Sequence, residues 1–139
     1  MLMSKFQKVI LGFSGFIAFA IGSLIMIEPL AFYAGYGLTL DNDPNLLSEL
    51  RGPGANLAAL GGFVMAGLLI KSLEKAAIAI ALIIFLAFPV GRVISIFADG
   101  MPSESVLAAL AIEMVVGTLL LIAFGKRSNS SRLTQTARA

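Results

Sequence analysis

The stretch that decides the fold is AAIAIALIIFLAFPVGRVISIF, residues 76–97, in which Arg92 is the only charged residue. A helix needs about 20 mostly apolar residues to cross the hydrocarbon core of a bilayer. Outward from this stretch, three further apolar runs lie at about residues 9–27, 46–70 and 105–124. The sequence therefore predicts an all-α membrane protein whose single domain, residues 1–124, is a four-transmembrane-helix bundle.

The composition excludes several kinds of chemistry. Hydrophobic residues make up 58% of the 139 residues and charged residues 13%, which is unlike a soluble domain. The chain has no Cys and no His, so disulfides, thiolate nucleophiles, Ser-His hydrolysis and the usual zinc sites are excluded. We expect no metal site and no cofactor, and membrane lipids rather than nucleic acid as partners.

The charges outside the apolar runs predict the topology. The bases lie before the first run, between the second and third, and after the fourth: Lys5, Lys8, Lys71, Lys75, Lys126, Arg127, Arg132 and Arg138. The other two connections carry only acids: Glu28, Asp41, Asp43, Asp99 and Glu104. By the positive-inside rule, both termini are cytoplasmic in a bacterial inner membrane. Residues 125–139 are expected to form a flexible basic cytoplasmic tail.

The first apolar run has an alternative interpretation as a cleavable signal peptide. Lys5 and Lys8 precede it, and Ala18-Phe19-Ala20 has the small-residue pattern of a cleavage site. Cleavage there would leave three spans. Because the run continues through Ile27, which is long for a signal peptide, we favour a membrane span.

Small residues recur at helical spacing in all four runs. They are Gly12, Gly15, Ala18 and Gly22 in the first, Ala58, Gly62 and Ala66 in the second, Ala87, Gly91 and Ser95 in the third, and Gly117 in the fourth. Helices in lipid associate through such close-packing faces. The pattern predicts a tight bundle within one chain, and the same faces could serve a homodimer.

Four charges lie inside the apolar runs, and they are the candidate site: Glu49, Arg51, Arg92 and Glu113. Ionisable groups in hydrocarbon are costly and usually face a bundle interior or a wet cavity. We predict that they form one polar cluster in the outer half of the bilayer, together with Asn56. The cluster could hold an anionic or lipid headgroup on its arginines, or it could consist of salt bridges that fix helix register.

Two further features bear on that site. Gly52-Pro53-Gly54 predicts a break in the second helix, because proline lacks a backbone donor and clashes with the preceding turn. The aromatic segment at residues 30–36 could be a short helix along the outer interface or a loop packed over the bundle. Asp41-Asn42-Asp43-Pro44 is a helix-start signal.

The chain resembles a bacterial family of small four-helix membrane proteins, catalogued only as a domain of unknown function. The likeness rests on Glu49-x-Arg51 leading into Gly61-Gly62, on Gly91-Arg92 followed by Asp99-Gly-x-Pro102, and on Glu113. It covers roughly residues 12–124. It implies the four-span bundle and the relevance of those charges, and it supplies no activity. A looser similarity to DoxX-like membrane proteins, some of which accompany redox enzymes, rests mainly on size and shape.

Three functions fit these features. The one we favour is a binding or accessory protein that holds a lipid, a quinone-like molecule or a small anionic ligand, or that supports a larger membrane complex. The second is a small proton-coupled transporter that works as a dimer and uses Glu113. The third is an intramembrane isomerase-like enzyme in which Glu113 and Glu49 serve as acid and base.

Overall fold

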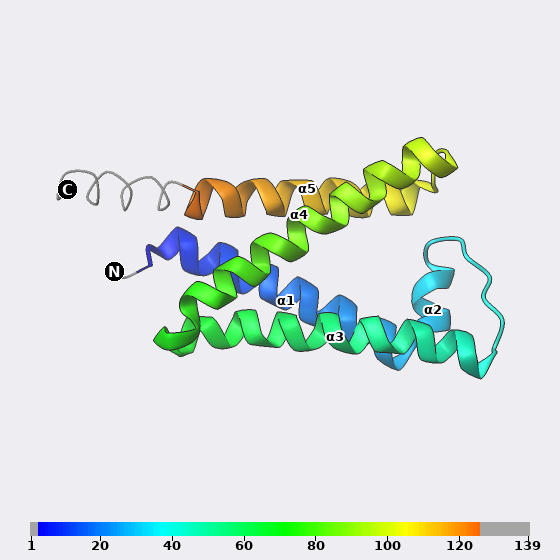
Figure 1. Ribbon diagram of the computed structural model, residues 1–139, viewed down its shortest axis with the longest axis horizontal. Coiled ribbons are helices and arrows are strands. Elements are labelled where there is room, and N and C mark those ends of the chain that lie inside the picture. Colours follow the sequence, from blue (N-terminus) through cyan, green and yellow to red (C-terminus); the bar gives the residue numbers. More distant parts are fainter. Residues whose placement is uncertain (1–2, 126–139) are drawn as a thin grey trace, which may run out of the picture.

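The computed structural model describes residues 3–125, and within that range every regular element is a helix. The elements are α1 (Lys5–Ile27), α2 (Pro29–Ala34), α3 (Pro44–Leu69), the short 3-10 turn η1 (Lys71–Leu73), α4 (Glu74–Asp99) and α5 (Glu104–Phe124) (Figure 1). Four of these helices are long and apolar enough to cross a membrane, which confirms the predicted fold class. The predicted tail, apart from Gly125, lies outside the described residues.

The helix termini follow local capping signals. The Ser4 hydroxyl accepts a hydrogen bond from the Gln7 backbone nitrogen at 3.2 Å, and the Gln7 side chain accepts one from the Ser4 backbone nitrogen at 2.9 Å. This capping box starts α1 at Lys5, four residues before the predicted span. Asp43 caps α3 through a bond from the Leu46 backbone nitrogen at 3.1 Å, and Pro44 follows it, as the helix-start signal predicts.

The bundle has two ends of different charge. Figure 1 shows the N-terminus, the α3–α4 connection and the end of α5 on one side, and α2 and the α4–α5 connection on the other. We call the first the basic end, because Lys5, Lys71 and Lys75 lie there. We call the second the acidic end, because its two connections carry the five loop acids and no bases.

Small residues let α1 and α3 approach to backbone contact along a common seam. It is formed by Gly15, Ala18 and Gly22 of α1 and by Gly54, Ala58 and Gly61 of α3. A Cβ atom on Gly61 would strike the backbone nitrogen of Phe19 and lie 2.7 Å from the carbonyl oxygen of Gly15. Only glycine allows this close approach. It maximises dispersion contact between the two helices, which matters in a bilayer because the hydrophobic effect does not drive helices together there.

The seam differs from the predicted small-residue faces in its register. The sequence prediction used Gly62, but a Cβ atom there would meet only the Phe19 ring, at 3.8 Å. One residue rotates a helix by about 100°, so Gly61 faces α1 and Gly62 does not. The predicted face on α4 is exposed at Ala87, Gly91 and Ser95, and a Cβ atom on Gly91 would meet nothing within 4 Å.

The predicted break at Gly52-Pro53-Gly54 is wrong, because α3 runs through it as one helix. Pro53 removes one backbone bond, which would otherwise reach the carbonyl of Glu49. Glu49 and Pro53 are both exposed near the acidic end, so that carbonyl is not enclosed by protein. The helix is held on its other side by the seam, where Gly54 is buried against α1.

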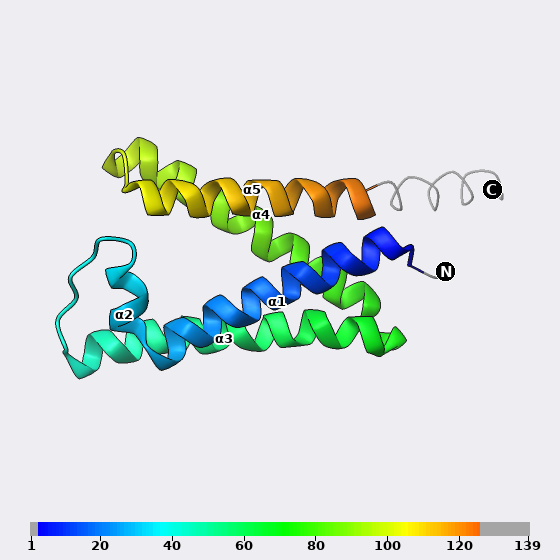
Figure 2. The same cartoon turned by 180° about the vertical axis from the view of Figure 1, so that it is seen from behind.

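The helix α5 is attached to the others mainly at its basic end and centre. There the Gln7 side chain donates to the Ala123 carbonyl oxygen at 2.6 Å, and Gly117 packs against the carbonyl oxygen of Phe85. Towards the acidic end α5 separates from α1 and α3, while α4 crosses diagonally between the two layers (Figures 1 and 2). This separation positions the site described next.

Candidate functional site

A cavity of about 290 Å³ lies between the separated layers, in the half of the bundle nearer the acidic end. The helix α2 and the turn after it lie over this cavity. Its lining is Ile17, Ala18, Ile21 and Ile25 of α1, Phe32, Tyr33, Tyr36 and Leu38 of α2 and its turn, Leu57 of α3, Ile84, Phe85, Phe88 and Arg92 of α4, and Val106, Ala109, Ile112 and Glu113 of α5. All but four of these side chains are hydrocarbon.

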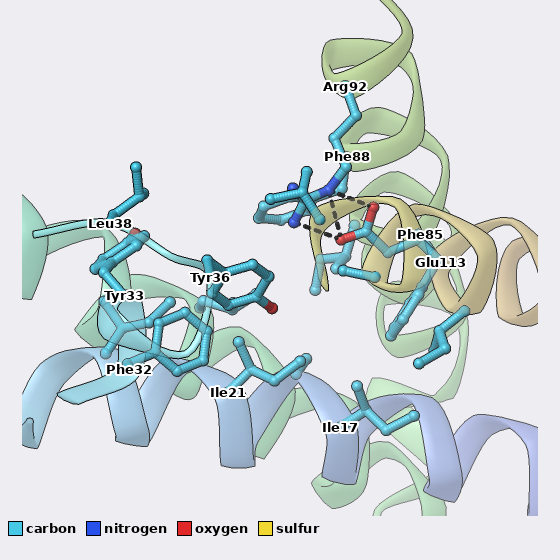
Figure 3. Close-up of a pocket in the computed structure, with 17 residues that line it drawn as sticks. Ile17, Ile21, Phe32, Tyr33, Tyr36, Leu38, Phe85, Phe88, Arg92 and Glu113 are labelled. Atoms are coloured by element: carbon cyan, nitrogen blue, oxygen red, sulfur yellow. Dashed lines mark hydrogen bonds and ion pairs between the residues drawn. The ribbon is translucent and has the colours of Figure 1, made fainter. Parts of the chain in front are cut away.

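The two charged groups of the cavity form an ion pair with each other. The Arg92 Nε donates to Glu113 Oε2 at 2.9 Å and to Oε1 at 3.2 Å, and the Arg92 Nη2 donates to Oε1 at 3.1 Å (Figure 3). The side chains are 26% and 15% exposed, respectively. Such fork-shaped bonding neutralises both charges and fixes the orientation of the guanidinium plane.

The pair lies well inside the hydrophobic part of the bundle. Glu113 is nine residues into α5 from Glu104, which is about 14 Å of helix rise. Arg92 is seven residues before the end of α4 at Asp99, or about 10 Å. The two residues therefore place one polar point on an otherwise apolar wall.

Aromatic rings of the acidic-end connection cover the other side of the cavity. The ring centroids of Phe32 and Tyr33 lie 5.2 Å apart, with the rings edge to face, and the centroids of Phe32 and Tyr36 also lie 5.2 Å apart. The turn after α2 is closed by a hydrogen bond from the Leu38 nitrogen to the Tyr33 carbonyl at 3.1 Å, and it needs glycine at Gly37, whose φ is +79°. The segment therefore combines the two predicted alternatives, since it is a short helix that packs over the bundle.

One side-chain hydrogen bond joins α2 and the turn after it, which together form the cover of the cavity, to the start of α5. The Ser103 hydroxyl donates to the Tyr36 carbonyl oxygen at 3.0 Å. Ser103 occupies the N-cap position of α5, but its hydroxyl makes no cap bond because it is used for this contact. The bond ties α2 and its turn to α5 across the acidic-end side of the cavity.

The electrostatics of the cover connect it to the ion pair. Burial raises the pKa of the Tyr33 hydroxyl above its ordinary value of 10.0, and the neighbouring Tyr36 adds to the rise. The positive charge of Arg92 acts in the opposite direction. Tyr33 therefore stays a neutral phenol at physiological pH, within electrostatic reach of the guanidinium.

The structure brings together two of the five predicted site residues, Arg92 and Glu113. Arg51 is exposed and donates from Nη1 to the carbonyl oxygens of Met26 at 2.5 Å and Ile27 at 3.1 Å. It thereby satisfies the last carbonyls of α1, where a cation also suits the helix dipole. Glu49 and Asn56 are both exposed, and neither lines the cavity.

Comparison with known proteins gives a family. The family model described as "Domain of unknown function (DUF4345)" matches residues 6–124. The chain belongs to this family. The resemblance identified from the sequence is thus confirmed, and it covers all four membrane-spanning helices. No curated protein and no solved structure matches the chain.

In this DUF4345 protein, sequence reasoning missed the aromatic and aliphatic lining of the site. A signal for it exists in the spacing around the two charges. Phe85 and Phe88 precede Arg92 by seven and four residues, so the three share one helix face. Ala109 precedes Glu113 by four residues in the same way. A charge in a span thus indicates which face of its helix borders the cavity.

Proposed function

We propose that this DUF4345 protein binds a lipid-like molecule in the cavity beside Arg92 and Glu113, and that it acts as a binding or accessory protein of the bacterial inner membrane. The observation that carries the proposal is the combination of one ion pair with an otherwise apolar and aromatic lining. Ligand sites typically combine a hydrophobic lining with a few placed polar groups.

The volume supports a small or partly inserted ligand. Pockets for small molecules usually measure about 300–1,000 Å³, and this cavity of about 290 Å³ is at the lower end of that range. A headgroup with the first part of a hydrocarbon chain is a suitable occupant. Because the cavity lies in the membrane-spanning part of the bundle, such a ligand can reach it from the bilayer.

The position of Glu113 favours binding over the other two functions. A proton-coupling carboxylate must be able to gain and lose its proton during the cycle. Both oxygens of Glu113 accept hydrogen bonds from Arg92, so the carboxylate is already engaged as the partner of the guanidinium. An acid–base pair for isomerisation needs a second group within reach of the same substrate, and Glu49 does not line the cavity.

The proposal is tested by filling the cavity. In Ala109→Phe, a ring is placed in the lining, and in the matched variant Ala108→Phe the same ring is added at the neighbouring exposed position of α5. Native mass spectrometry in mild detergent should show a bound small molecule or lipid in the wild type and in Ala108→Phe. It should be absent from Ala109→Phe with the helical circular dichroism unchanged. Equal occupancy in all three, or in none, would contradict the proposal.

The orientation belongs to the same proposal. The bases at one end and acids at the other support cytoplasmic termini and an acidic end that faces outward. Because the chain has no cysteine, single cysteines at Ser72 and Thr39 can be labelled in whole cells with a membrane-impermeant reagent. We expect labelling at Thr39 alone, and labelling at Ser72 alone would reverse the orientation.

A homodimer also remains a proposal. The exposed small residues Ala87, Gly91 and Ser95 of α4 would permit close contact with a second helix.

A further inference from the structure

We propose that the ligand presents a neutral, hydrogen-bond-accepting head, such as a carbonyl or hydroxyl oxygen, to the Arg92 guanidinium, and not an anionic head. This inference rests on the proposed binding function and specifies the ligand class. It revises the expectation from sequence that a charged pocket would hold a small anion.

The charge of the site disfavours an anionic head. Three hydrogen bonds join Arg92 to Glu113, so the positive charge is compensated within the protein itself. Within residues 3–125, no other lysine or arginine lines the cavity. An anionic head would therefore bring an unbalanced negative charge next to the Glu113 carboxylate, and like charges repel strongly in a low-dielectric site.

The hydrogen-bonding groups that remain unused in the site favour a head that accepts hydrogen bonds. Arg92 uses Nε and Nη2 for Glu113, and in the described part of the chain its Nη1 has no hydrogen-bond partner. A guanidinium can only donate. The Tyr36 hydroxyl also has no hydrogen-bond partner in the same range, and its ring projects from the cover into the cavity (Figure 3). A ligand oxygen that accepts from Nη1 would satisfy the arginine, and the phenol offers a second polar group on the cavity wall.

The surroundings of that polar point also favour a neutral head. Phe85 and Phe88 lie on the arginine's own helix and Tyr36 lies on the cover, so a head that enters the site exchanges water for mostly apolar and aromatic neighbours. A neutral oxygen loses far less hydration than a carboxylate or phosphate on entering such a site. The hydrocarbon lining then accommodates the chain or ring attached to it.

The test uses amphiphiles with one chain and different heads. Methyl dodecanoate and dodecanol carry neutral acceptor oxygens, dodecanoate carries an anion, and dodecylammonium a cation. Each is titrated into the full chain in phosphatidylcholine nanodiscs, and affinity is obtained from the ligand-dependent rise in unfolding temperature. Ala109→Phe gives the background from partition into the bilayer.

For the wild type we expect at least one neutral amphiphile to bind at least tenfold more tightly than both dodecanoate and dodecylammonium. A tenfold difference in affinity corresponds to a penalty of about 1.4 kcal/mol for the charged head. A preference for the ester over the alcohol would indicate that the natural ligand presents a carbonyl oxygen, as a lipid ester or ketone does. The opposite preference would indicate a hydroxylated lipid. Either order supports the proposal.

A charge change in the site sharpens the result. In Glu113→Gln the Arg92 charge is no longer compensated, so dodecanoate should gain about tenfold in affinity and approach or exceed the neutral series. In the double variant Arg92→Gln with Glu113→Gln, the neutral amphiphiles should weaken. Glu49→Gln, an exposed carboxylate remote from the lining, should leave all four affinities unchanged.

Two outcomes would overturn the inference, and they are distinguishable. Dodecanoate binding to the wild type as tightly as the neutral amphiphiles, with loss in Ala109→Phe, would reject the neutral head and keep the binding site. No difference between the wild type and Ala109→Phe for any head would reject both. If Glu113→Gln does not fold, the wild-type series with Ala109→Phe decides the question alone.

Discussion

The α1–α3 seam and the acidic-end cavity show two opposite ways of packing helices in one small bundle. In the seam, glycines bring two backbones into contact, and no room remains even for a methyl group on Gly22 or Gly61. At the cavity, the large side chains Phe85, Phe88 and Tyr36 surround open volume beside one ion pair. The seam gives a rigid frame, and the separated layers give a site.

The difference indicates where the chain can change without losing its fold. Helix association in lipid depends on close packing, so the seam carries much of the stability. Polar groups inside a membrane protein are costly, and those that persist are usually functional. We therefore expect substitutions in the seam to act on folding, and substitutions at the cavity to act on ligand binding with smaller effects on stability.

The largest effect is expected from Gly61→Ala in the seam. Its methyl group would strike backbone atoms of Phe19 and Gly15, which cannot move aside as a side chain can. We expect a loss of about 3 kcal/mol or more in the free energy of unfolding, at or above the top of the usual range for overpacking. Gly62→Ala is the matched control and should be neutral or slightly stabilising. Equal loss in both variants would contradict the seam.

The next largest effect concerns the ion pair. Arg92→Gln or Glu113→Gln alone leaves one charge uncompensated, and because both side chains are partly exposed we expect a loss of about 2–3 kcal/mol, below the 3–5 kcal/mol of fully buried pairs. The double variant should recover most of it. Unfolding titrations in detergent measure the cycle. Additive losses in the double variant would show that the two residues are not energetically coupled.

A smaller, local effect is expected at the cover of the cavity. Ser103→Ala removes the bond to the Tyr36 carbonyl, which is worth about 1 kcal/mol and corresponds to about a fivefold faster amide hydrogen exchange. The increase should be confined to residues 29–43. Ser105→Ala, exposed two residues further along, is the control. Unchanged exchange in residues 29–43 would show that this bond does not hold the cover in place.

The smallest effect is a titration shift. The chain has two tyrosines, so Tyr36→Phe leaves Tyr33 as the only tyrosine. Because burial raises its pKa, tyrosinate absorbance should appear with a midpoint above pH 10.0. Adding Arg92→Gln should move the midpoint higher, since the arginine charge lowers this pKa. A midpoint at or below pH 10.0 would contradict the burial of the Tyr33 hydroxyl. No response to Arg92→Gln would contradict the effect of the arginine charge on its pKa.

Much of the fold could be predicted from the sequence, because membrane solvation limits what a chain can do. Four apolar runs with bases and acids in alternate connections predict four helices. The register of the seam was harder to predict, because Gly61 and Gly62 both fit a small-residue pattern and only three-dimensional packing selects Gly61. The unbroken α3 was mispredicted, since Pro53 lies on an exposed side of the helix where its missing bond does little harm.

The site was predictable only in part. Arg92 and Glu113 stand out because charges in long apolar spans are rare. Arg51 and Glu49 stand out equally in the sequence, but they lie within two turns of the start of α3 and are exposed, so depth distinguishes them. The cavity itself depends on how far α5 separates from α1, a tertiary property that no local pattern reports.

Ligand binding in the cavity would be tested most directly by an experimental structure of the wild type crystallised from a lipidic mesophase. We expect elongated density within the cavity, with its polar end beside the Nη1 of Arg92 and its chain along Phe85 and Ile112. The Arg92–Glu113 pair should be retained beneath it. A cavity closed by movement of α5 onto α1, or an ion pair broken by an anionic ligand, would contradict this expectation.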